Sequence, residues 1–189
     1  MTQHAQTLSD AEIAAIARRI DRPVVLVGLM GTGKSTVGKR LAHLLGKGFV
    51  DADDEIETAA QMSVSEIFEQ YGEDYFRDGE RRVIARLMEE GHGVIATGGG
   101  AFVNDATRAL ILERGIAVWI DCDIDTLVER TGRRNTRPLL RDGDPQEILT
   151  RLRDERKPHY GEAPIRVRSE EGPHLETAVS IIEAIDRWL

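Results

Sequence analysis

The sequence GLMGTGKST, residues 28–36, directly follows the short apolar run VVLV. It matches the pattern G-x-x-x-x-G-K-[ST] at Gly28, Gly33, Lys34 and Ser35. Glycines in such a loop let backbone N–H groups turn toward phosphate oxygens, and the helix that follows adds the positive end of its dipole. The lysine reaches the outer phosphates, and the hydroxyl can bind Mg²⁺. The sequence therefore predicts a strand, a phosphate loop and a helix in succession, and with them a bound nucleotide.

The rest of the chain alternates between short apolar runs and helical patterns. Five strands are predicted, in VVLV, GKGFVDAD, GVIATGGG, GIAVWIDCD and APIRVRS. Helical patterns cover about residues 34–45, 55–90 and 105–113, a segment from about 124, a helix ending near 160, and the C-terminal segment. This alternation predicts an α/β fold, a parallel sheet with helices on both faces. Ligands of such sheets bind beyond the carboxyl ends of the strands, so the residues after each strand are the candidates for a site.

An amphipathic helix is predicted ahead of the first strand. Ser9 and Glu12 form a capping box, and Ile13, Ile16 and Ile20 follow at helical spacing. The segment contains no residue pattern with chemical meaning. We interpret residues 1–21 as an N-terminal helical extension, packed on the main domain or partly mobile, and residues 22–189 as the P-loop domain.

Composition restricts the classes of function. The chain has 189 residues, which suits one domain, a net charge of −8 and a single cysteine, Cys122. An acidic chain is a poor general binder of nucleic acid or anionic membranes. The sequence has neither a run of about 18 apolar residues nor a secretory signal pattern. We therefore expect a cytoplasmic protein without nucleic-acid or membrane partners, in which Cys122 is a packing residue and the five histidines are structural.

Two acidic residues follow the second predicted strand. In an extended segment Asp51 and Asp53 point to the same side, because side chains alternate along a strand. One carboxylate could then serve Mg²⁺, and the other could accept a proton from an attacking hydroxyl. A solvated acidic turn is the alternative. Asp54 and Glu55 are expected to cap the next helix.

Two further segments are candidates for an acceptor site. In FRDGE, Arg77 and Glu80 are three residues apart and share a helix face, although a surface ion pair is the ordinary outcome of this spacing. In TGGGA, residues 97–101, three glycines follow the third strand. Such a run makes sense where a ligand approaches the main chain closely, although a tight turn would also explain it.

Arginines are concentrated in the segment that follows residue 129. They stand at positions 130, 133, 134, 137 and 141, in a stretch bracketed by glycine and proline that suits a mobile lid over about residues 130–144. An arginine above the phosphates would neutralise charge that develops during transfer. Further on, Arg156 precedes Tyr160 by four residues; it could bind a carboxylate or remain an exposed helix charge.

Taken together, these segments resemble the shikimate kinases. The resemblance runs from about Pro23 to the C-terminus and rests on GLMGTGKST, DAD, FRDGE, TGGGA, RPLL and ERKPHY in this order. It implies a three-layer P-loop kinase fold with strand order 2-3-1-4-5 and a mobile lid. It also implies a monomeric enzyme that uses ATP and Mg²⁺ to phosphorylate the 3-hydroxyl of shikimate. Ala52 departs from the family's common threonine, and its side chain is expected to point away from the site.

The resemblance implies a role for each matching residue. Catalytic roles fall to Lys34, Asp53 and Arg137. ATP would be bound by Gly31, Thr32, Gly33, Lys34, Ser35, Thr36, Arg130 and Arg137, with Arg130 at the adenine, and Mg²⁺ by Ser35 and Asp51. Shikimate would be bound by Asp53, Arg77, Glu80, Gly98, Gly99, Gly100 and Arg156, with the two arginines at its carboxylate and Glu80 orienting Arg77.

Two other functions remain open at the level of sequence. A gluconate kinase or another small-metabolite kinase would share the phosphate loop, but not the joint set FRDGE, TGGGA and ERKPHY. A catalytically idle, nucleotide-switched binding module would be expected to have lost its acceptor residues. Asp53, Arg77 and Arg156 are all present. Release of ADP in the presence of shikimate, gluconate or nucleoside monophosphates would distinguish these functions.

Overall fold

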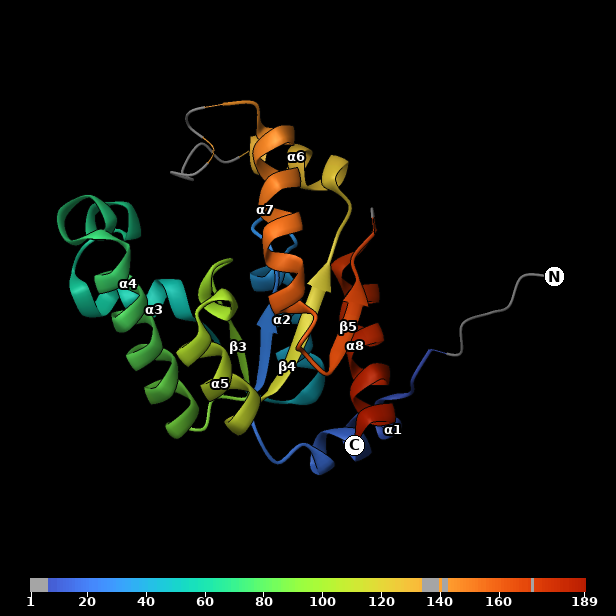
Figure 1. Ribbon diagram of the computed structural model, residues 1–189. Coiled ribbons are helices and arrows are strands. Elements are labelled where there is room, and N and C mark those ends of the chain that lie inside the picture. Colours follow the sequence, from blue (N-terminus) through green and yellow to red (C-terminus); the bar gives the residue numbers. More distant parts are fainter. Residues whose placement is uncertain (1–6, 134–139, 141–142, 171) are drawn as a thin grey trace.

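The computed structural model describes residues 7–133, 140, 143–170 and 172–189. Within these ranges the chain forms one five-stranded sheet in the order β2-β3-β1-β4-β5, with every neighbouring pair parallel (Figure 1). The predicted α/β class and the order 2-3-1-4-5 are both confirmed. The strands are β1 (Val24–Val27), β2 (Phe49–Asp51), β3 (Val94–Ala96), β4 (Ile116–Asp121) and β5 (Ile165–Arg168).

Helices connect the strands, and most of the described helices begin at a residue whose side chain caps the first turn. The predicted capping box of Ser9 with Glu12 is present, and Ser63 forms a second one with Glu66. The stretch predicted as one helical pattern over 55–90 contains two helices, separated at Gln61, which is in the left-handed conformation. The helices are α1 (Asp10–Arg19), α2 (Lys34–Leu45), α3 (Ala52–Ala60), α4 (Val64–Glu89), η1 (Ala101–Val103), α5 (Asp105–Arg114), α6 (Ile124–Gly132), α7 (Pro145–Tyr160) and α8 (His174–Trp188).

Alternate side chains of each strand enter two separate cores. In β1, Val24 and Leu26 pack with residues of α1, α2 and α8, whereas Val25 and Val27 pack with residues of α4, α5, α6 and α7. All four side chains of β1 are fully buried, as expected for the central strand of a sheet covered on both faces (Figure 1). Of the residues described, no helix has both the length and the apolar composition to cross a membrane.

The helix α4 has a kink at Gly72. The backbone there has φ 83° and ψ 174°, which is outside the helical region and is accessible mainly to glycine. The segment that carries Arg77 and Glu80 is therefore a helix of its own on the carboxyl side of this kink. Phe76, Ile67 and Ile56 bury a small separate core between α3 and α4.

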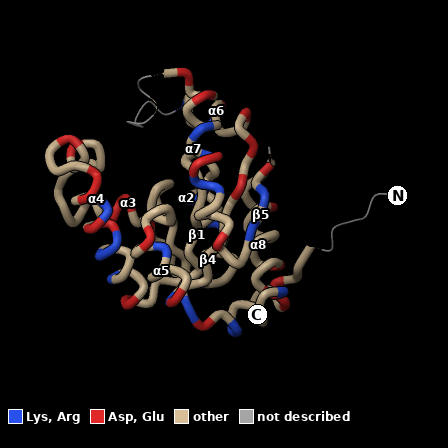
Figure 2. The backbone as a smooth tube through the Cα atoms, in the orientation of Figure 1, with Lys and Arg blue, Asp and Glu red and all other residues tan. Residues whose placement is uncertain are grey.

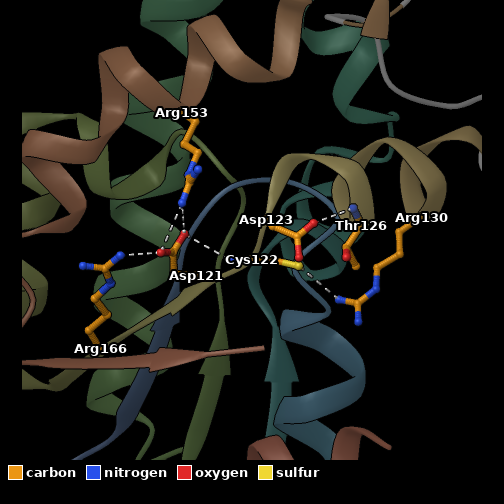
Figure 3. A network of polar contacts seen from close by, with 7 residues as sticks. All are labelled: Asp121, Cys122, Asp123, Thr126, Arg130, Arg153 and Arg166. Carbon is orange, nitrogen blue, oxygen red and sulfur yellow. Dashed lines mark hydrogen bonds and ion pairs between the residues drawn. The ribbon is translucent and has the colours of Figure 1, made fainter. Parts of the chain in front are cut away.

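A buried carboxylate joins three elements at the end of β4. Asp121, which is 4% exposed, forms ion pairs with Arg153 of α7 and Arg166 of β5 (Figure 3). The Arg166 guanidinium also lies 4.4 Å from the centroid of the Trp119 ring. Two positive groups thus compensate one buried negative charge, and they fix α7 against the sheet.

The predicted N-terminal extension is packed on the same core as α2 and α8. Ile13, Ile16 and Ile20 are each about 5% exposed or less, and Arg19 forms an ion pair with Asp186 of α8. Because no residue of α1 reaches the carboxyl edge of the sheet, its contribution is expected to be to stability.

Ile16→Ala should therefore lower the free energy of unfolding by about 2–5 kcal/mol, because it leaves a cavity in this core. Urea unfolding measures the loss, and steady-state kinetics on the same preparation should show unchanged Michaelis constants. Ala15→Ser, at an exposed position of α1, is the matched control and should stay within about 0.5 kcal/mol of the unmodified protein. A stable Ile16→Ala protein with altered kinetics would instead give α1 a part in the site.

Candidate active site

The phosphate loop lies between β1 and α2, as its motif predicted. Gly33 is the N-cap of α2 and has φ 89°, a left-handed conformation that suits glycine. Lys34 is buried, and its Nζ donates hydrogen bonds to the carbonyl oxygens of Gly28 at 2.7 Å and Leu29 at 2.8 Å. The loop thus holds its lysine beside the N-terminus of α2, where the helix dipole favours an anion.

Arg130 of α6 is the second positive group at this loop. Its Nη1 donates to the carbonyl oxygens of Thr32 at 3.3 Å and Gly31 at 3.4 Å, and lies 4.0 Å from the Cys122 sulfur (Figure 3). The structure therefore brings Arg130 to the predicted nucleotide side. Arg137, the predicted lid arginine, lies outside the described residues.

His174 also faces the loop, although the sequence patterns did not single it out. Its Cε1 lies 3.2 Å from the place that a Cβ on Gly33 would occupy. Burial and the nearby charges of Arg130 and Arg40 lower the pKa of His174, so the neutral imidazole is favoured beside these two cations. Its contact with Gly33 depends on the fold alone, because 141 positions separate the two residues in the sequence.

Ser35 and Asp51 place two oxygen ligands next to each other. The Ser35 hydroxyl donates to Oδ2 of Asp51, while Oδ1 of Asp51 accepts the backbone N–H of Asp53 at 2.9 Å. Asp51 therefore has one oxygen committed to the N-cap of α3 and one directed at Ser35. In the part of the chain that the structure describes, no group of three or more acidic, histidine or cysteine side chains could hold a metal.

The expectation of an extended DAD segment is wrong at its second carboxylate. The strand β2 ends at Asp51, Asp51 caps α3, and Asp53 lies in the first turn of that helix. The helix begins earlier than predicted because the Asp51 side chain accepts hydrogen bonds from the first N–H groups of α3. Ala52 is fully buried. Asp53 nevertheless reaches the carboxyl edge of the sheet, because the first turn of α3 continues directly from β2.

The three glycines after β3 each contact a different predicted acceptor side chain. A Cβ on Gly98 would lie 2.9 Å from an oxygen of Asp53, and a Cβ on Gly99 would lie 3.2 Å from Nη1 of Arg156. A Cβ on Gly100 would lie 2.2 Å from Nη2 of Arg77, a clash that no side chain could avoid without displacing the arginine. The glycine turn, residues 98–100, is therefore where side chains of α3, α4 and α7 meet.

Arg77 is held by two carboxylates of its own helix. Its Nη1 donates to Oε1 of Glu80 at 2.8 Å, and its Nε lies 3.5 Å from Glu73. The predicted face shared by Arg77 and Glu80 is confirmed. Glu80 is fully buried, and its second oxygen, Oε2, has no hydrogen-bond partner among the described residues.

A cavity of about 180 Å³ opens beside the glycine turn. It is lined by Glu73, Asp74, Arg77, Gly100, Val103, Asn104 and Arg156. The sequence motifs do not indicate a role for Glu73 or Asn104. The spacing of four residues between Glu73 and Arg77 was a signal for the first, whereas Asn104, the N-cap of α5, reaches the cavity only through the fold.

Two carboxyl groups near this cavity have strongly raised pKa values. Burial and the neighbouring Asp51 carboxylate raise the pKa of Asp53 to about 6, against the opposing charges of Lys34 and Arg77. Burial raises the pKa of Glu80 to about 7, although the Arg77 guanidinium favours its charged form. Both groups therefore change charge near neutral pH, which is typical of a functional site.

The positive charge of the site is local. Acidic and basic residues are interspersed along the described helices (Figure 2), and the chain as a whole carries a net charge of −8. Against this background Lys34 and Arg130 lie on one side of the glycine turn, and Arg77 and Arg156 contact the turn itself. Gly99 adjoins the phosphate loop, since a Cβ there would lie 3.3 Å from the backbone nitrogen of Met30. The arrangement can bind two anions next to each other.

Comparison with known proteins gives one consistent match. The sequence model of the shikimate kinase family matches residues 30–186. The chain is 63% identical to a shikimate kinase of Novosphingobium aromaticivorans, with all of both chains covered. It is similar in structure to the shikimate kinase of Acinetobacter baumannii in complex with shikimate, with TM-score 0.84, 37% identity, and 88% of this chain and 93% of the other covered. A gluconokinase of Sinorhizobium meliloti (TM-score 0.61, 17% identity, 89% and 94% covered) shares the fold alone.

The raised pKa of Glu80 makes the stability of the unliganded protein depend on pH. A carboxyl whose pKa is higher in the folded than in the unfolded state stabilises the fold at low pH, and this stability is lost as the pH rises through the folded value. The free energy of unfolding should fall as the pH rises from 4.5, the ordinary pKa of the group, to about 7, and Glu80→Gln should remove on the order of 3 kcal/mol of that change. Urea unfolding at several pH values measures it.

The matched control for this experiment is Glu69→Gln, at an exposed position of α4 on the amino side of the kink. It should retain the pH dependence of the unmodified protein. An unchanged slope in Glu80→Gln would show that Glu80 stays ionised in the folded protein, paired with Arg77 at every pH tested.

Proposed function

Since the chain belongs to the shikimate kinase family and catalyses the ATP-dependent phosphorylation of shikimate, we propose that two groups of its residues divide the reaction. The phosphate loop and Arg130 bind ATP, and the glycine turn with Asp53, Arg77 and Arg156 binds shikimate. The observation that carries this proposal is the contact of each of these three side chains with one glycine of the turn, next to the phosphate loop.

On the ATP side, residues 31–36 surround the phosphates, and the Lys34 ammonium exchanges loop carbonyl oxygens for phosphate oxygens. Its hydrogen bonds to Gly28 and Leu29 support this role, because they place the ammonium at the phosphate loop. Arg130 lies against the loop and binds the nucleotide from the side of α6. Arg137 is proposed from sequence alone as the arginine that neutralises charge on the transferred phosphoryl group.

Ser35 and Asp51 fit a Mg²⁺ ion. Both are hard oxygen ligands, they lie within hydrogen-bonding distance of each other, and Oδ1 of Asp51 is committed to the cap of α3. Two protein oxygens are enough, because Mg²⁺ in kinases is completed by water and by the phosphates of the substrate. When bound, the ion would neutralise charge on the outer phosphates of ATP.

On the acceptor side, Arg77 and Arg156 bind the carboxylate of shikimate, and Glu80 fixes the guanidinium of Arg77. Both arginines line the same cavity from different helices, which supports recognition of one anionic group between them. Asp53 orients the 3-hydroxyl and takes its proton as the oxygen attacks the γ-phosphorus. A pKa of about 6 suits a base that is ionised at neutral pH.

We also propose that the enzyme acts as a monomer in the cytoplasm, without nucleic-acid or membrane partners. All the residues assigned to ATP, Mg²⁺ and shikimate belong to one chain, so the site needs no second copy. Sedimentation at the concentration used for kinetics would test the monomer.

Arg77→Ala and Arg156→Ala should each weaken shikimate binding by about 10- to 150-fold and leave the affinity for ATP unchanged. A charge-assisted hydrogen bond contributes roughly 1.5–3 kcal/mol, which corresponds to this range. Calorimetric titration with each substrate measures both affinities. Arg82→Ala, at an exposed position on the same helix as Arg77, is the matched control. Normal shikimate affinity in both variants would contradict the assignment of the carboxylate.

Asp53→Asn should lower kcat by about 10²–10⁴, because asparagine keeps the size of the side chain but cannot accept the proton. A loose, dissociative transfer needs less help from a base, which favours the lower end of this range. Coupled ADP release measures kcat, and ATP affinity should be retained. Asp54→Asn, the exposed neighbour, should remain active. Loss of ATP binding with near-normal turnover at saturation would reverse the roles of Asp51 and Asp53.

A further inference from the structure

Tyr160 is a buried hydroxyl group that the reaction described above does not use. It is the last residue of α7 and is 2% exposed. Its ring packs on Trp119 of β4, with 5.8 Å between the ring centroids. Its hydroxyl donates a hydrogen bond to the carbonyl oxygen of Gly99, in the middle of the glycine turn.

The Tyr160 hydroxyl acts as a hydrogen-bond donor because it stays protonated. Burial raises the pKa of Tyr160 above its ordinary value, although the nearby charge of Arg156 acts in the opposite direction. The phenol therefore keeps its proton at neutral pH. A buried hydroxyl without a partner is costly, so the bond to Gly99 fixes the tyrosine and the turn relative to each other.

The hydrogen bond from Tyr160 to the Gly99 carbonyl oxygen fixes the whole peptide unit between Gly99 and Gly100. No cis peptide bond occurs in the described chain, so the Gly99 oxygen and the Gly100 N–H point in opposite directions from one planar unit. The Gly100 N–H donates to no other backbone group of the residues described here. Gly100 also lines the acceptor cavity. The bond from Tyr160 thus fixes the Gly99–Gly100 peptide unit, whose second residue lines that cavity.

The same helix approaches Gly99 a second time through Arg156. One helical turn separates Arg156 from Tyr160, so both side chains lie on the face of α7 that meets the turn. Arg153, one turn earlier again, is tied to Asp121 at the end of β4 (Figure 3). The half of α7 that carries Arg156 is therefore attached to the sheet by Arg153 before it and to the turn by Tyr160 after it.

We propose that Tyr160 is a positioning residue for shikimate: its buried hydroxyl holds the Gly99–Gly100 peptide and the end of α7 together, so that the turn and Arg156 present one acceptor site. This inference rests on the proposed assignment of Arg156 and the glycine turn to shikimate. Tyr160 touches neither substrate nor the reacting atoms in this scheme.

Tyr160→Phe tests the proposal, because it removes the hydroxyl and keeps the ring. The Michaelis constant for shikimate should rise about 3- to 10-fold, the range expected for one neutral hydrogen bond, while that for ATP stays within about 2-fold. Trp119→Phe is the control for packing. It alters the ring against which Tyr160 lies and should lower the unfolding temperature without separating the two Michaelis constants.

A ligand-specific measurement keeps the proposal testable if Tyr160→Phe is less stable. Shikimate and ADP each raise the unfolding temperature of the protein that binds them. In Tyr160→Phe the shift produced by shikimate should shrink, and the shift produced by ADP should be retained. Equal shifts from shikimate in both proteins, or equal loss of both shifts in the variant, would overturn the proposal.

A double variant tests the route through Arg156. With Arg156→Lys and Tyr160→Phe combined, the loss of shikimate affinity should be smaller than the product of the two single losses, because both act on one arrangement. Losses that simply multiply would overturn the coupling that the proposal requires. If Arg156→Ala leaves shikimate affinity intact, the assignment of Arg156 itself fails. If Arg156→Ala weakens shikimate binding but Tyr160→Phe does not, the inference about Tyr160 fails and the assignment of Arg156 stands.

Discussion

The proposed acceptor site depends on the absence of side chains at residues 98–100. The helices α3, α4 and α7 each direct one polar side chain at this turn. A Cβ at any of the three glycines would lie 3.2 Å or less from one of these side chains. Larger residues there would displace Arg77 first, since its guanidinium lies closest to the backbone. The position of β3 next to β1 then places the turn beside the phosphate loop, so that the strand order makes the proposed ATP and shikimate sites adjacent.

An acidic protein that binds two anions has to concentrate positive charge locally. Three of the cations around the turn and the loop are paired in different ways. Lys34 and Arg130 donate to neutral carbonyl oxygens of the loop, whereas Arg77 lies beside Glu80 and Glu73. Burial raises the pKa of Glu80 far enough that its charge, and with it the net charge around Arg77, depends on pH near neutrality.

Much of this arrangement could be predicted from the sequence, because each of its local patterns is typical of one local structure. The phosphate loop, both capping boxes and the pair of Arg77 with Glu80 depend on residues within a few positions of each other. The strand order came from the family resemblance. The early start of α3 was not predicted, because Asp51 is both the last residue of β2 and the N-cap of α3. Long-range partners could not be predicted: Tyr160 with Gly99, and Asp121 with Arg153 and Arg166, are separated by 61, 32 and 45 positions.

The kink at Gly72 has an electrostatic consequence. In an uninterrupted helix from Val64 to Glu89, Arg77 would lie in the middle, where the end charges of the helix dipole are no longer felt. With the interruption, the helix that carries Arg77 begins anew at about Glu73, and its positive end lies at the cavity that Glu73 and Asp74 line. A single glycine with a positive φ thus gives this cavity a helix N-terminus, whose positive end would add to the attraction that the arginines are proposed to exert on a carboxylate.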